Sequence, residues 1–139
     1  MRPTAVVIPL AVLALAGCGQ GGGGTSTDTG KFSGEDKAVA QVIADLSDDG
    51  QGRKPSEICN DLIATSLKQR IEAAGAKCAT EMRKAIEDAD DFSLEVTDVT
   101  VDGAQATAKV RSLDGGKKVT RTFTLTREGK AWKIAKFAT

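Results

Sequence analysis

The sequence predicts an α+β domain in which about three helices precede a four-stranded antiparallel sheet. Apolar residues recur at helical spacing from residue 33 to residue 89, and from Phe92 onward they alternate with polar residues at the period of a strand. Asp-Gly, Asp-Gly-Gly and Glu-Gly turns divide this second half into hairpins. Helices segregated from a run of strands are typical of helices packed on one sheet face.

We expect the first helix to begin at Ser33, whose side chain can cap the first turn, with Asp36 at the third position of an acidic capping box. Its apolar stripe consists of Val39, Val42, Ile43 and Leu46. The polar run Asp48-Asp49-Gly50 is expected to end this helix.

Pro55 and Ser56 start a second helical stretch, which bends near Thr65-Ser66 and stops at Gly75. A third helix is predicted from about Ala76 to Ala89. Its apolar stripe is formed by Cys78, Met82, Ala85 and Ile86.

Four strands then form a meander. The apolar residues of the first strand change parity at Thr97-Asp98, which predicts a β-bulge there. The following strand alternates Gln, Thr, Lys and Arg with small apolar residues, and the third alternates threonines with larger side chains. The positions expected on the apolar face are Phe92, Leu94, Val96, Val99, Val101, Ala104, Ala106, Ala108, Val110, Val119, Arg121, Phe123, Leu125, Trp132, Ile134 and Phe137.

The N-terminal residues have the pattern expected of a targeting signal. Arg2 precedes an apolar run, residues 5–16, that is interrupted by Pro9 and followed by Gly17-Cys18. The run is too short to span a bilayer, which takes about 20 residues. Leu15-Ala16-Gly17-Cys18 resembles the lipobox of bacterial lipoproteins, in which the cysteine receives a diacylglycerol and becomes the new N-terminus. The alternative is a plain secretory signal with a chance cysteine.

This resemblance implies three regions. Residues 1–17 are a signal peptide, residues 18–30 are a lipidated Cys18 with a glycine-rich flexible tether, and residues 31–139 are a single domain. The chain is then lipid-anchored at the extracytoplasmic face of the cell membrane.

Cys59 and Cys78 remain as a pair in an oxidising compartment, which favours a structural disulfide between two neighbouring helices. A metal site needs more ligands than two thiols, and the chain has no histidine. A redox-active pair is more often a short Cys-x-x-Cys.

The net charge is zero, which argues against nucleic acid as a partner. The charge is nevertheless uneven, because residues 31–92 hold nine basic and thirteen acidic side chains whereas residues 93–139 hold nine basic and five acidic. The basic half either favours anionic head groups or wall polymers or is a solvated sheet face rich in lysine, and we favour the second interpretation.

Two helices with ICNDLIATSLKQRI and AKCATEMRKAI are followed by the turn in VTVDGAQATAKV and the closing FTLTREGKAWKIAKF. This order of elements resembles the small cystatin-like or nuclear-transport-factor-2-like (NTF2-like) domains of bacterial envelope lipoproteins. The resemblance covers about residues 33–138. It implies a curved sheet wrapped around N-terminal helices to form a cone with an open mouth.

Enzymes of this superfamily place Asp, Tyr or His inside the cone, but this chain has neither His nor Tyr. It also has no phosphate-binding loop, and no serine has a partner base. We therefore expect no catalytic residues, cofactor or metal. The alternative is an isomerase or dehydratase that uses a buried carboxylate, for which Asp45 and Asp61 are candidates.

The expected function is a non-catalytic binding or assembly module whose partner is an envelope protein or a small apolar ligand. A sensing lipoprotein that signals through a partner is a further possibility. Arg121 and Trp132 are the candidate pocket-lining residues. Arg121 either meets an anionic ligand or Glu95, or it snorkels at a sheet edge, which we favour. Trp132 either lines a cavity or belongs to the core, and the core is more common for a lone tryptophan in a closing strand.

Overall fold

The computed structural model describes residues 28–137. The predictions for the signal peptide, Cys18 and most of the tether therefore lie outside the described residues. The helices are α1 (Gly34–Gln51), α2 (Pro55–Glu57), the π-helical turn η1 (Ile58–Leu62), α3 (Thr65–Ala73) and α4 (Cys78–Asp88). The strands are β1 (Glu95–Asp102), β2 (Gln105–Asp114), β3 (Lys117–Glu128) and β4 (Ala131–Lys136). The predicted α+β class is confirmed.

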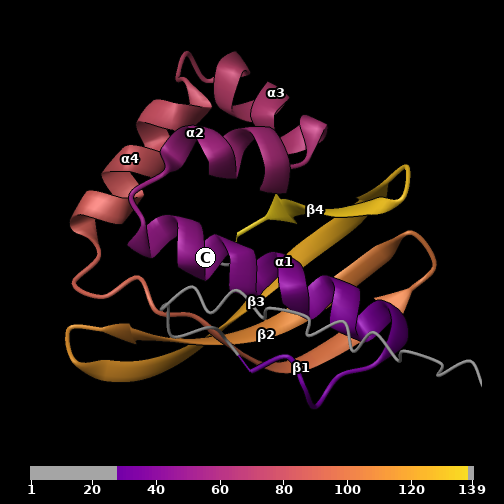
Figure 1. Ribbon diagram of the computed structural model, residues 1–139. Helices are drawn as coiled ribbons and strands as arrows, with labels where there is room; N and C mark the ends of the chain where they lie inside the picture. Colours follow the sequence, from indigo (N-terminus) through magenta and orange to yellow (C-terminus); the bar gives the residue numbers. More distant parts are fainter. Residues whose placement is uncertain (1–27, 138–139) are drawn as a thin grey trace, which may run out of the picture.

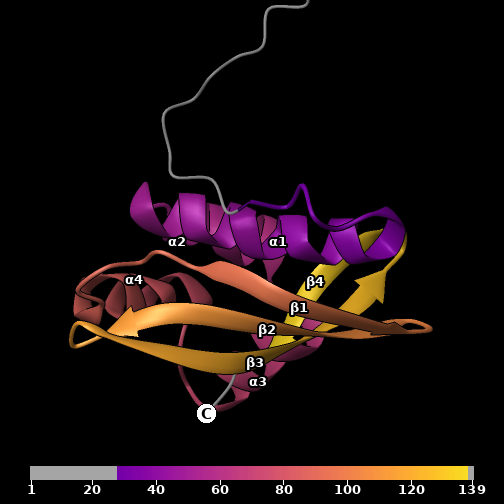
Figure 2. The ribbon, with the colours of Figure 1, turned by 90° about the horizontal axis from the view of Figure 1, so that it is seen from below.

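The four strands form one antiparallel sheet in the order β1-β2-β3-β4. The predicted bulge is present, since the β1–β2 register shifts between Val96 and Asp98. Figures 1 and 2 show a curved sheet with α1 running along it and α4 near the tip of the β2–β3 hairpin. Ala104 lies in the first hairpin turn and is exposed, so its predicted place on the apolar face was wrong.

The core lies between α1, η1 and the inner face of the sheet. Its largest fully buried side chains come from both halves of the chain, which shows that helices and sheet share one core: Val39, Ile43, Leu46, Ser47, Ile58, Ile63, Val96, Val110, Leu125 and Ile134.

The predicted start of α1 is confirmed, since Ser33 is the N-cap residue of a helix that begins at Gly34, but two details at its ends differ from the prediction. Ser33 makes no side-chain capping bond, and the first turn is instead tied to the sheet, where Glu35 accepts a hydrogen bond from Trp132. The helix also continues through Gly50 to Gln51. Gly50 is buried against the ring of Phe92, so the absent side chain serves close packing rather than a helix end.

The second helical stretch is interrupted at Ile63-Ala64, close to the predicted bend. Ile63 forms an isolated parallel bridge with Ile134, and the Ala64 N–H donates to the Ile134 carbonyl at 2.8 Å. Backbone groups that bond to β4 are no longer available to continue the helix. The predicted stop at Gly75 is present, where φ is +79° and the Ala76 N–H reaches back to the carbonyl of Ile71.

The predicted disulfide is present. Cys59 of η1 and Cys78 at the start of α4 are joined, with their Cα atoms 6.0 Å apart. Within residues 28–137, no helix has the length and apolar character that a membrane crossing requires.

Candidate functional site

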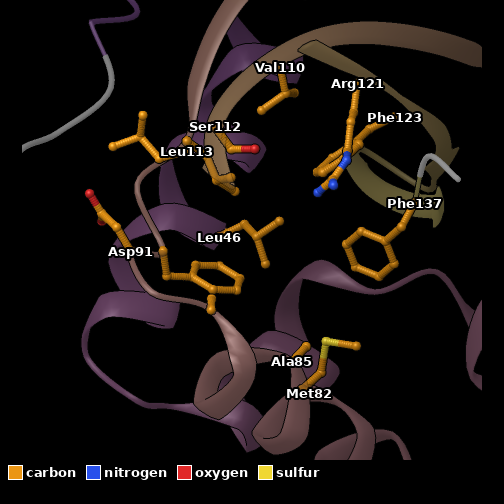
Figure 3. Close-up of a pocket in the computed structure, with 13 residues that line it drawn as sticks. Leu46, Met82, Ala85, Asp91, Val110, Ser112, Leu113, Arg121, Phe123 and Phe137 are labelled. Atoms are coloured by element: carbon orange, nitrogen blue, oxygen red, sulfur yellow. The ribbon is translucent and has the colours of Figure 1, made fainter. Parts of the chain in front are cut away.

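An apolar cavity of about 240 Å³ lies between α1, α4 and the part of the sheet beneath the β2–β3 hairpin (Figure 3). Leu46 comes from α1, and Met82 and Ala85 come from α4. The remaining lining residues come from the segment after α4, from β2 and β3, and from the C-terminal end: Ala89, Asp91, Phe92, Leu94, Val110, Ser112, Leu113, Arg121, Phe123 and Phe137.

One wall of the cavity is the extended segment between α4 and β1, which α1 holds in place. The buried Ser47 hydroxyl accepts a hydrogen bond from the Leu94 N–H at 3.0 Å and donates to the Phe92 carbonyl at 3.3 Å. A Cβ at Gly50 would come within 1.9 Å of the Phe92 ring. Ser47 and Gly50 thus position Phe92 and Leu94. The sequence did not indicate this role of Ser47 and Gly50, because their partners lie more than 40 residues further along the chain.

The aromatic part of the cavity is formed where the sheet meets the C-terminal end. The rings of Phe123 and Phe137 lie edge to face, with centroids 5.4 Å apart and an interplanar angle of 86°. This is a favourable geometry for an aromatic pair. Figure 3 shows Leu46 and Val110 near them, so most of the cavity surface is hydrocarbon.

Three polar side chains border the cavity, and they point in different directions. In Figure 3 the guanidinium of Arg121 points into the cavity, whereas the carboxylate of Asp91 points away from it. The third is Ser112. Arg121 donates through Nη2 to Asp114 Oδ2 at 2.9 Å, and its side chain is 46% exposed. The inward cation is therefore half solvated and belongs to the mouth of the cavity.

Of the two candidate pocket-lining residues, Arg121 lines this cavity and Trp132 does not. The ion-pair partner of Arg121 is Asp114; Glu95 pairs instead with Arg111 at 3.2 Å. Arg121 lies on the part of β3 that β4 does not pair, which is consistent with a charged residue at a sheet edge.

Trp132 is 4% exposed and packs in the core. Its Nε1–H donates to Glu35 Oε2 at 2.7 Å, and Arg127 lies over its ring at 4.8 Å from the centroid. The hydrogen bond from Trp132 is the main cause that lowers the pKa of Glu35, and the Arg127 guanidinium acts in the same direction. This cluster fixes the start of α1 on the sheet.

The carboxylates considered for catalysis lie elsewhere. Asp45 accepts a hydrogen bond from Gln41 at 2.8 Å, Asp61 is exposed on η1, and neither lines the cavity. Among residues 28–137, no group of three or more His, Cys, Asp or Glu side chains could hold a metal ion.

The comparisons with known proteins give no family. No family model matches the chain, and no curated protein matches it. Among solved structures, the chain is similar to a de novo designed NTF2 fold protein, NT-9, with 18% identity and a TM-score of 0.45 over 76% of this chain and 85% of that one. At this identity nothing about function transfers from that protein.

Proposed function

We propose that this chain is a non-catalytic binding module, anchored by a lipid on Cys18 at the outer face of a bacterial membrane, that takes a small apolar ligand. The observation that carries the ligand proposal is the cavity of about 240 Å³ lined by Leu46, Met82, Phe92 and Phe123. Ligand sites are mostly apolar and carry a few polar groups that orient the ligand. The anchor proposal is supported by Leu15-Ala16-Gly17-Cys18 and the glycine-rich stretch after it.

The size of the cavity restricts the ligand. A dry apolar cavity of about 150 Å³ holds benzene, with six carbon atoms, and drug-sized ligands need about 300 Å³ or more. By proportion, a cavity of about 240 Å³ takes roughly ten non-hydrogen atoms. A medium alkyl chain or a single substituted ring is of this size.

The isomerase or dehydratase alternative has less support. It requires a carboxylate inside the cavity, and the carboxylate among the lining residues is Asp91, which is exposed and turned outward (Figure 3). A desolvated base there would need a different side-chain arrangement.

The test compares two substitutions of alanine by tryptophan. Ala85→Trp places a ring at the cavity, whereas Ala38→Trp makes the same change at an exposed position of α1 that does not line it. The full-length Cys18→Ser chain is titrated with 1-octanol, and NMR shifts of the Met82 methyl group are followed.

We expect saturable shifts in the parent chain and in Ala38→Trp, and at least about tenfold weaker binding in Ala85→Trp, because the added ring occupies the space of the ligand. Thermal unfolding of each variant checks that it is folded. Absence of saturable binding to the parent chain, or unchanged affinity in a folded Ala85→Trp variant, contradicts the proposal.

A further inference from the structure

We infer that the ligand of this cavity is an anionic amphiphile, with an apolar body in the cavity and a carboxylate bound to Arg121. This inference rests on the proposed function and specifies the chemical class of its ligand. It follows from Arg121, the one cation among the described residues that line the cavity, and from the direction in which its guanidinium points (Figure 3).

The guanidinium of Arg121 has more N–H donors than its contact with Asp114 uses. A guanidinium carries five N–H groups, and the contact with Asp114 uses Nη2. Asp114 is 62% exposed, so its pairing with Arg121 competes with water and is weak. A ligand carboxylate that approaches from the cavity side can therefore accept from the same guanidinium, and a charge-assisted bond of this kind is stronger than a neutral one.

The geometry around Arg121 matches an amphiphile. On β3, Phe123 follows two residues later on the same face, and its ring contacts Phe137. Val110 lies directly opposite Arg121 on β2. The guanidinium is half exposed while Phe123 is buried, so the polar group lies at the mouth and the hydrocarbon lies deeper. A ligand with one charged end and one apolar end satisfies both surfaces.

Acidic side chains also lie near the mouth. Asp88, Asp90 and Asp114 border a neighbouring depression that shares Arg121, and Asp91 borders the cavity itself. All four are exposed, so their fields are screened over about 8–10 Å at physiological salt. They weaken the attraction of an anion at long range, whereas contact with Arg121 acts at hydrogen-bond distance. If the acidic residues dominated, the cavity would instead select a cationic head group.

The experiment uses three unbranched eight-carbon compounds with different head groups: octanoate, 1-octanol and octylammonium. Each is titrated at pH 7 into the full-length Cys18→Ser chain, and dissociation constants are measured from NMR shifts, with the Arg121 Nε–H signal followed as well. Arg121→Gln removes the proposed charge. Arg111→Gln is the matched control, because Arg111 is also a half-exposed arginine of the same sheet that pairs with one carboxylate.

We expect octanoate to bind about tenfold more tightly than 1-octanol in the parent chain and in Arg111→Gln. In Arg121→Gln the two are expected to bind equally, and octanoate should shift the Arg121 Nε–H signal of the parent chain. Tighter binding of octylammonium, or an octanoate preference that survives in Arg121→Gln, overturns the inference while leaving the binding module intact. Failure of all three compounds to bind overturns the proposed function itself.

Discussion

Gly50→Ala tests how α1 shapes the cavity wall. The added Cβ would lie 1.9 Å from Cδ1 and 2.2 Å from Cε1 of Phe92, far inside van der Waals contact. The ring cannot move away with its backbone, because Ser47 bonds to the Phe92 carbonyl and to the Leu94 N–H. We expect the Phe92 ring to rotate out of its packed position.

Two opposing effects set the magnitude. Alanine is favoured over glycine in a helix by about 1 kcal/mol, because glycine loses more backbone entropy on folding. Overpacking of a filled site costs about 1–3 kcal/mol. The net expectation is a loss of about 1 kcal/mol in the free energy of unfolding, equivalent to a lowering of Tm by roughly 4–8 °C in a domain of this size.

A double-mutant cycle with Phe92→Ala isolates the clash. Urea unfolding is followed by the fluorescence of Trp132, the single tryptophan of the chain. With the ring removed, Gly50→Ala should become stabilising by up to about 1 kcal/mol, since the helix propensity is then unopposed. An equal effect of Gly50→Ala with and without the Phe92 ring would refute the reasoning.

Three further predictions concern other parts of the chain. Replacing both Cys59 and Cys78 by alanine should lower the free energy of unfolding by about 3 kcal/mol, as expected for a loop of about this length; reduction of the parent chain should give the same loss, and a change below about 1 kcal/mol in urea unfolding would contradict it. The pKa of Glu35 is lowered from its ordinary value of 4.5 chiefly by the hydrogen bond from Trp132, so its contribution to stability is present above about pH 4.5 and is lost as the pH falls through the folded-state pKa. Stability measured from pH 7 down to pH 2 should therefore fall more steeply below pH 4.5 in the parent chain than in Glu35→Gln, and parallel curves would count against this account. Cys18→Ala should move the protein from the membrane fraction to the soluble fraction without changing its Tm, and continued membrane retention would argue against the lipobox.

The elements that the sequence predicts correctly are those determined by local pattern. The helical stripe that contains Leu46 and the alternation around Phe123 each follow from a period that a few adjacent residues define. The end of α3 at Gly75 was predictable because a glycine adopts a positive φ without regard to its distant neighbours. The bulge after Val96 was predictable because the apolar residues change parity along one strand. Such signals need no knowledge of what the segment packs against.

The features that the sequence does not predict share a different cause, since each depends on a partner far along the chain. Gly50 continues α1 because Phe92 fills the space beside it, and Ile63 leaves the helical path because it bridges to Ile134. The start of α3 is similar: the Thr65 N–H donates to the carboxylate of Glu128, 63 residues later, at 2.6 Å. Local sequence holds no signal for these contacts, so the bend was predicted without its cause and the end of α1 was placed at Gly50 rather than at Gln51.

The same distinction between local patterns and distant contacts applies to the candidate site. Arg121 stood out in the sequence because it is a charge on an otherwise apolar strand face, and that local contrast led to a residue at the cavity mouth. Trp132 was considered for a cavity wall or for the core, and its indole lies in the core, where it donates to Glu35. Met82 and Leu94 were predicted only as apolar positions, because a cavity wall and a packed core have the same composition in sequence.

The cavity itself results from unequal strand lengths. β4 has six residues and pairs with β3 only from Thr124 to Glu128, and the β1–β2 pairing ends at Glu95, opposite Arg111. The β2–β3 hairpin therefore extends beyond both neighbouring strands, and its inner face needs cover from elsewhere. α4 lies nearest to it (Figures 1 and 2), and the residues of α4 that line the cavity are Met82 and the small Ala85. An apolar surface left partly uncovered at a half-open end is where a small ligand gains most from burial, at about 25 cal/mol per Å² of apolar area. It follows that lengthening β4 or enlarging Ala85 should close the cavity and stabilise the fold, and should weaken the binding that we propose for it.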